Sequence, residues 1–122
     1  MIAFSKRMDD VMAATKLAAV LHDPILTRFR AALDELYGGR LERVVLFGSR
    51  ARGEARADSD YDVAVFLTAL PDRWRELDRL ADLRVRFLDE TGAFFDAKPY
   101  SAATYRDATP LMHEIRREGL EL

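Results

Sequence analysis

Hydrophobic residues follow two patterns along this chain, one helical and one typical of short buried strands. Residues 9–21 have moderate helical periodicity. A second helix is better marked, because Asp23 suits the N-cap, Pro24 suits the first helical position and apolar residues follow at helical spacing. The pair Gly38-Gly39 is expected to end that helix.

Three short segments rich in apolar residues predict strands. The first covers residues 43–47, directly before Gly48, and the second covers residues 60–67. The third covers residues 93–98, and Pro99 is expected to stop it because proline has no N–H to donate to a strand ladder. The small and polar residues between the first two strands suit a short helix followed by a turn.

Two further helices complete the pattern. Apolar positions recur at helical spacing through residues 73–90, and the last helix has Thr109 as its cap, Pro110 at its first position and Gly119 at its end. The large residues of the longer helix that we expect in the core or an interface are Trp74, Phe87 and Leu88. The whole order of elements predicts a compact α/β domain.

Composition narrows the classes of function. A length of 122 residues suits one domain, and 49% hydrophobic with 33% charged residues is ordinary for a globular protein. The absence of cysteine excludes a disulfide scaffold, a Cys-ligated zinc site, an iron–sulfur cluster and a thiol nucleophile, and it fits a cytoplasmic location. The net charge of −2 gives no strong nucleic-acid signal, and no apolar run is long enough to suggest a membrane partner.

The chemistry is concentrated where the first predicted strand ends. Gly48 allows a sharp turn and a close approach of the backbone to a ligand. Ser49 begins the next helix, so its hydroxyl and the free N–H groups of that helix form a candidate anion site. Arg50 and Arg52 flank this site and can neutralise phosphate oxygens.

Acidic residues follow on the next strands. Asp60 and Asp62 are two residues apart, so the pleat places both carboxylates on one face, while Tyr61 points to the other face and is expected to pack. Carboxylates side by side repel each other unless a cation lies between them, and oxygen ligands favour Mg²⁺. Asp96 lies within the third strand, and the three carboxylates could hold two metal ions for phosphoryl or nucleotidyl transfer.

This combination carries a family resemblance. Phe47-Gly48-Ser49, ten residues, then Asp60-Tyr61-Asp62 resembles the signature of the DNA polymerase β-like nucleotidyltransferase superfamily, and residues 48–53 look like its minimal nucleotidyltransferase branch. The resemblance covers about residues 24–120. It implies a short mixed β-sheet flanked by helices, with residues 1–122 as a single minimal nucleotidyltransferase domain and residues 1–22 as an N-terminal helical extension.

The resemblance also implies residue roles. Gly48 and Ser49 would bind the triphosphate of ATP. Arg50 and Arg52 would contribute to the same phosphate-binding site. Asp60 and Asp62 would bind Mg²⁺, and Asp96 would complete the metal site and act on the incoming hydroxyl. The minimal branch resembles the antitoxin of prokaryotic HEPN/MNT toxin–antitoxin pairs. The leading hypothesis is therefore a protein adenylyltransferase that moves AMP from ATP to a hydroxyl, expected to be a tyrosine, of a HEPN-type ribonuclease toxin.

Other interpretations stay open from the sequence. The chain could neutralise a partner sterically, without catalysis, or transfer a nucleotide to a small molecule such as an antibiotic. Asp60 and Asp62 could be turn or strand residues without a ligand, Asp96 a surface residue, Arg50 and Arg52 solvated charges and Ser49 a simple helix cap. The apolar stretch near residues 2–21 is a candidate contact in a homo- or hetero-oligomer.

Overall fold

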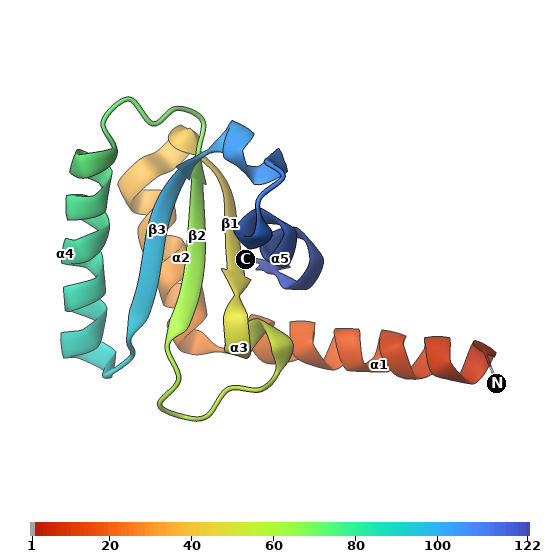
Figure 1. The fold of residues 1–122 in the computed structure, drawn as a ribbon. Coiled ribbons are helices and arrows are strands. Elements are labelled where there is room, and N and C mark those ends of the chain that lie inside the picture. The colour runs from red at the N-terminus through yellow and green to blue at the C-terminus, as the bar shows by residue number, and fades with distance from the viewer. Residues whose placement is uncertain (1) are drawn as a thin grey trace.

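The computed structural model describes residues 2–122 and follows the expected order of elements, with additions near the C-terminus (Figure 1). The elements in order are α1 (Ile2–Leu21), α2 (Pro24–Tyr37), the 3₁₀ turn η1 (Gly38–Arg40), β1 (Leu41–Phe47), α3 (Gly48–Arg52), β2 (Tyr61–Leu67), α4 (Arg73–Thr91), β3 (Phe95–Ser101), the 3₁₀ turn η2 (Ala102–Arg106), α5 (Pro110–Glu118) and β4 (Leu120–Glu121). The predicted α/β class is confirmed.

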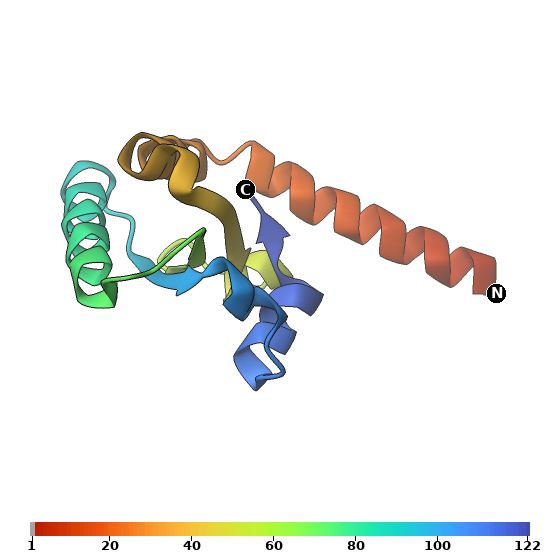
Figure 2. The ribbon, with the colours of Figure 1, turned by 90° about the horizontal axis from the view of Figure 1, so that it is seen from above.

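The four strands form one mixed sheet in the order β3-β2-β1-β4. Strand β1 is antiparallel to both β2 and β4, whereas β2 and β3 are parallel. Helices α2 and α4 lie on one side of the sheet and α5 lies on the other, while α1 extends away from these layers (Figure 2). No helix within residues 2–122 combines the length and the apolarity needed to cross a bilayer.

Local chemistry sets the helix ends as the sequence indicates. The Asp23 carboxylate accepts hydrogen bonds from the backbone N–H groups of Ile25 at 2.9 Å and Leu26 at 3.2 Å, so it caps α2. The Thr109 hydroxyl accepts from the N–H of Met112 at 3.2 Å and caps α5. Both helices carry proline in the first turn, where its missing N–H has no helical partner to lose.

The alternation of β2 separates a packing face from a chemical face. Tyr61, Val63, Val65 and Leu67 are buried in the core that α2 and α4 cover. The intervening residues, Asp62, Ala64 and Phe66, therefore point to the side of α5. A smaller core of Val45, Ala64, Phe66, Met112 and Ile115 fills that second side. Because α5 and η2 cover only part of this face, Asp62 is left half-buried beside a cavity.

Tyr61 fixes the register of the acidic segment. Its ring stacks on Phe95 with centroids 4.6 Å apart, and Phe95 stacks on Phe29 at 3.8 Å. Its hydroxyl donates a hydrogen bond of 2.7 Å to the Asp23 carboxylate, which joins β2 to the cap of α2. Burial of the phenol, with this bond to a carboxylate, raises the pKa of Tyr61 to about 12. The expectation that Tyr61 packs opposite its acidic neighbours is confirmed.

One expectation about elements was wrong. Strand β3 continues through Pro99 to Ser101 because it lies at the edge of the sheet. The carbonyl of Pro99 accepts a hydrogen bond from Arg73 at 3.3 Å, so it points away from β2. The N and the C=O of one strand residue point to the same side, so the missing N–H of Pro99 interrupts no ladder bond.

The large residues of α4 that were expected in the core or an interface separate in the structure. Phe87 is buried with Glu76, Leu80 and Leu83 on the core face of the helix. Trp74 and Leu88 are 79% and 40% exposed and lie outside the core, so their place in an interface stays a prediction.

We predict that Tyr61→Ala lowers the free energy of unfolding by about 3–5 kcal/mol, because it removes a buried ring from the aromatic stack. The matched variant Tyr61→Phe keeps the ring and loses only the hydrogen bond to the Asp23 carboxylate, so it should cost about 1.5–3 kcal/mol, less than Tyr61→Ala. Urea unfolding measures both values. Equal losses for the two variants would contradict the role assigned to the ring.

Candidate active site

A cavity of about 430 Å³ opens on the α5 side of the sheet, where β1 ends and where β2 and β3 begin. Its polar lining comes from Ser49, Arg52, Asp62, Asp96, Lys98 and Glu114. These side chains belong to α3, β2, β3 and α5, so residues far apart in the sequence share one cavity. The structure thus brings together Gly48, Ser49, Arg52, Asp62 and Asp96 from the predicted site.

The closest approach in this cavity is between Gly48 and Asp62. The antiparallel register pairs Phe47 with Asp62, so the turn into α3 passes directly over the aspartate. Gly48 has φ +73°, and a Cβ there would lie 3.2 Å from Asp62 Cγ and closer still to its Oδ2. Only glycine therefore allows both the turn and the position of this carboxylate.

Ser49 lies in the first turn of α3 and lines the cavity half-buried. The N-cap of α3 is Phe47, and no side chain caps this helix. The interpretation of Ser49 as a simple helix cap is therefore not what the structure shows. The backbone N–H groups of the first turn lack helical partners, as at every helix start, and become available to an anion in the cavity.

The aspartates of β2 and β3 are side by side. Asp62 pairs in register with Asp96 on the parallel strand, so both carboxylates project from the same face. Asp60 precedes β2 and is exposed outside the cavity lining. Lys98 approaches the Asp96 carboxylate at 3.9 Å. Burial, followed by repulsion from the charges of Asp96, Asp60 and Glu114, raises the pKa of the Asp62 carboxyl.

This donor set fits a divalent cation, although it is not a closed metal cage. Among the side chains that the structure describes, no three carboxylate or imidazole groups meet closely enough to hold one ion by themselves. Asp62, Asp96 and Glu114 nonetheless line one cavity, with Asp62 and Asp96 in register on neighbouring strands. Mg²⁺ characteristically uses one or two protein carboxylates and completes its shell with phosphates and water, so an open pair of aspartates suits it.

Arg50 is directed away from the cavity. Its guanidinium donates to the backbone carbonyl of Ser59 at 2.6 Å through Nη2 and lies 3.9 Å from the Tyr61 ring. Weaker bonds reach the carbonyls of Arg56 and Ala57 in the same loop. These contacts hold the loop that precedes the aspartates, and the role in phosphate binding that the sequence indicates for Arg50 stays a prediction.

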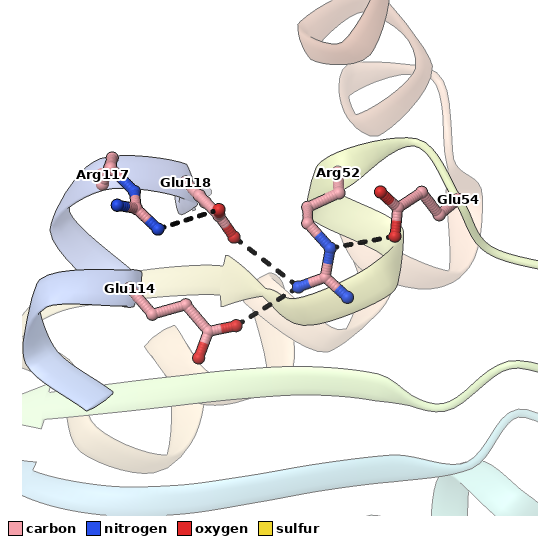
Figure 3. Close-up of polar contacts among 5 residues, drawn as sticks. All are labelled: Arg52, Glu54, Glu114, Arg117 and Glu118. Carbon is pink, nitrogen blue, oxygen red and sulfur yellow. Dashed lines mark hydrogen bonds and ion pairs between the residues drawn. The ribbon is translucent and has the colours of Figure 1, made fainter. Parts of the chain in front are cut away.

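Arg52 lines the cavity but is surrounded by carboxylates, as Figure 3 shows. It contacts Glu54 at 3.0 Å, Glu114 at 3.2 Å and Glu118 at 3.6 Å. The hydrogen bond to Glu54, with the charges of Glu118 and Glu114, raises the pKa of the Arg52 guanidinium. Glu114 is not among the residues predicted from the sequence, because no local signal indicates that α5 brings this residue into the same cavity as the aspartates.

Comparison with known families identifies the class of protein. The sequence profile of the nucleotidyltransferase domain matches residues 26–100 of this chain. That segment contains Gly48, Ser49 and all three predicted aspartates. The chain therefore belongs to the nucleotidyltransferase domain family, and the expected family is confirmed.

One curated relative of this chain has a named activity. A protein of Methanocaldococcus jannaschii named as a protein adenylyltransferase, MJ0141, is 36% identical over 47 residues, which is 38% of this chain and 48% of that protein. The matched segment thus spans about half the length of this curated relative.

Solved structures show the same fold at low sequence identity. A nucleotidyltransferase from Sulfolobus solfataricus superposes with a TM-score of 0.58 at 16% identity, covering 90% of this chain and 85% of that one. A toxin–antitoxin structure with AMP-PNP has a TM-score of 0.54 at 21% identity, covering 77% and 69%. A mutant of the MntA-HpeT toxin–antitoxin has a TM-score of 0.52 at 19% identity, covering 75% and 68%.

We predict that Gly48→Ala is more damaging than Gly92→Ala. Both glycines have nearly the same positive φ, +73° and +74°, but a Cβ at Gly92 would meet nothing within 4 Å. Each variant should lose about 1–2 kcal/mol of stability from backbone strain. Only Gly48→Ala should also displace the Asp62 carboxylate, costing about 1–3 kcal/mol more. Thermal unfolding measures the difference, and equal losses would contradict the close approach.

We predict that Asp62→Asn raises the melting temperature at pH 7 in metal-free buffer. A carboxyl whose pKa is raised on folding stabilises the folded protein at pH values below its ordinary pKa of 3.8. This contribution is lost as the pH rises through the raised pKa of the folded state. Asparagine removes the ionised group that destabilises the folded state at pH 7, so the gain should shrink toward pH 3.8. The exposed Asp78→Asn should change little, and a destabilised Asp62→Asn would contradict the repulsion.

Proposed function

We propose that this chain is a Mg²⁺-dependent protein adenylyltransferase that acts as the antitoxin of a HEPN-type ribonuclease toxin. The observation that carries the proposal is the packing of Gly48 against Asp62, with Asp96 in register beside it. Family membership supports nucleotidyl transfer, and the names of the M. jannaschii relative and of the toxin–antitoxin structures support a protein acceptor.

Each residue has a defined part in this proposal. The turn at Gly48 and Ser49 would receive the triphosphate of ATP, and the carboxylates of Asp60, Asp62 and Asp96 would hold the cations, one or two in number. Bound Mg²⁺ supplies charge neutralisation at the phosphate oxygens and orients the triphosphate for in-line displacement. The contacts of Arg50 with the Ser59 carbonyl and the Tyr61 ring would keep Asp60, at the end of this loop, and Asp62, in β2, in place.

The transfer step is a displacement at phosphorus. The oxygen of an acceptor hydroxyl, expected to be a tyrosine of the toxin, forms a bond to the α-phosphorus of ATP. The bond from the α-phosphorus to its bridging oxygen breaks, and pyrophosphate leaves with that oxygen. The hydroxyl proton passes to the Asp96 carboxylate, which is half-buried in the cavity and lies in register beside Asp62.

We predict that the partner toxin gains whole AMP units in intact-mass spectrometry after incubation with this protein, ATP and Mg²⁺. The double variant Asp60→Ala/Asp62→Ala should abolish the gain, since it removes two of the three cation-binding carboxylates. Asp58→Ala removes an exposed carboxylate from the same loop that is not one of the three proposed cation ligands, so it should leave the gain within about twofold of wild type.

Fragmentation of the modified toxin then identifies the acceptor side chain, for which we expect tyrosine. The catalytic proposal would be overturned if the wild type and the double variant both formed a tight complex with the toxin and neither increased its mass. That result would favour steric neutralisation instead. Removal of Mg²⁺ with a chelator should stop the reaction completely, and a metal-independent gain would contradict the role of the aspartates.

A further inference from the structure

Arg52 uses its hydrogen-bond donors on carboxylates of its own chain (Figure 3). Its Nε donates to Glu54, which follows α3, and its Nη1 faces both Glu114 and Glu118 of α5. Arg117 also contacts Glu118, at 3.3 Å, so two guanidinium groups face three carboxylates and the cluster keeps a net negative charge. A triphosphate that approached this guanidinium would meet the three carboxylates already gathered around it, and their negative charge opposes the binding of an anion.

Glu114 is the member of this cluster that belongs to the cavity. It lies on α5, the helix that packs on the same sheet face as Asp62 and Asp96, and it lines the cavity with them. Its charge also acts on Asp62. Glu118, one turn further along α5, contacts the same guanidinium but does not line this cavity. Glu114 also lies outside residues 26–100, the segment that the family profile matches.

A tether is needed to keep Glu114 there. Glu114 and Glu118 are four residues apart on one helix face, so their charges repel each other. The Glu114 side chain is 36% exposed and would be free to turn toward solvent. The ion pair with Arg52 at 3.2 Å holds its carboxylate at the junction of α3, β2 and α5.

We propose that Glu114 is a fourth carboxylate of the cation–nucleotide site, contributed by α5, and that Arg52 is the positioning residue that holds it in the cavity. This inference rests on the proposed function, because it concerns the same site. Glu114 adds negative charge where the cation of a metal–triphosphate complex lies beside Asp62. The contribution of Arg52 to nucleotide binding then passes through Glu114 rather than through a direct contact with phosphate.

The two roles of Arg52 predict opposite results for Glu114→Gln. If Arg52 were a direct phosphate ligand, removing a competing carboxylate would strengthen nucleotide binding. If Glu114 supports the cation, Glu114→Gln should weaken binding of AMP-PNP in the presence of Mn²⁺ about fivefold, a change typical of one charge interaction in a partly solvated site. Isothermal titration calorimetry on the full chain measures this affinity.

Three comparisons make the test specific. Arg52→Ala should weaken Mn²⁺-supported AMP-PNP binding in the wild-type background but not in the Glu114→Gln background. Glu118→Gln, which removes a neighbouring charge outside the cavity, should stay within about twofold of wild type. With EDTA in place of Mn²⁺, Glu114→Gln should not weaken AMP-PNP binding, because no cation then needs the carboxylate. A purely structural role would weaken binding under both conditions.

Unchanged or stronger binding by Glu114→Gln with Mn²⁺ would overturn the inference, as would an equal loss in Glu118→Gln. An Arg52→Ala effect of the same size in both backgrounds would also overturn it. These outcomes are distinct from failure of the proposed function. In that case the wild-type chain itself would bind no AMP-PNP with Mn²⁺, whatever residue stands at position 114.

Discussion

The geometry of the site depends on one steric constraint, the passage of the Gly48 backbone over the Asp62 carboxylate. Antiparallel pairing of β1 with β2 places Phe47 opposite Asp62, so the chain must turn into α3 directly above that side chain. Glycine is required at position 48 for two reasons. It adopts the positive φ of the turn, and it has no Cβ that would clash with the Asp62 carboxylate. The start of a helix and an acidic strand are thereby brought into one cavity.

The second feature of the site is the concentration of negative charge around Asp62. Asp62 is desolvated and also faces the charges of Asp96, Asp60 and Glu114, while Lys98 compensates only in part. A fold that places carboxylates together in this way gives up some stability, which is common where structure serves binding. The cluster around Arg52 extends this acidic character onto α5, beyond the segment that the family profile covers.

Much of the fold could be predicted from local signals. Asp23 and Thr109 cap helices, proline lies in the first turn of both, and strands follow the apolar runs, because each of these features depends on residues within a few positions of one another. The structure adds to the sequence pattern where residues distant in the chain become neighbours in space. Pro99 stays within β3 because that strand is at the edge of the sheet, and Trp74 is exposed because α4 turns another side to the core.

The same division holds for function. The sequence by itself determined the family, the turn at Gly48 and Ser49 and the spacing of Asp60 and Asp62, since strand alternation needs only neighbouring residues. Only the tertiary structure decided that Arg50 secures a loop, that Arg52 is occupied by carboxylates and that Glu114 lies beside the aspartates. The partners of a long charged side chain depend on how helices pack on the sheet, and that packing joins residues that no sequence interval connects.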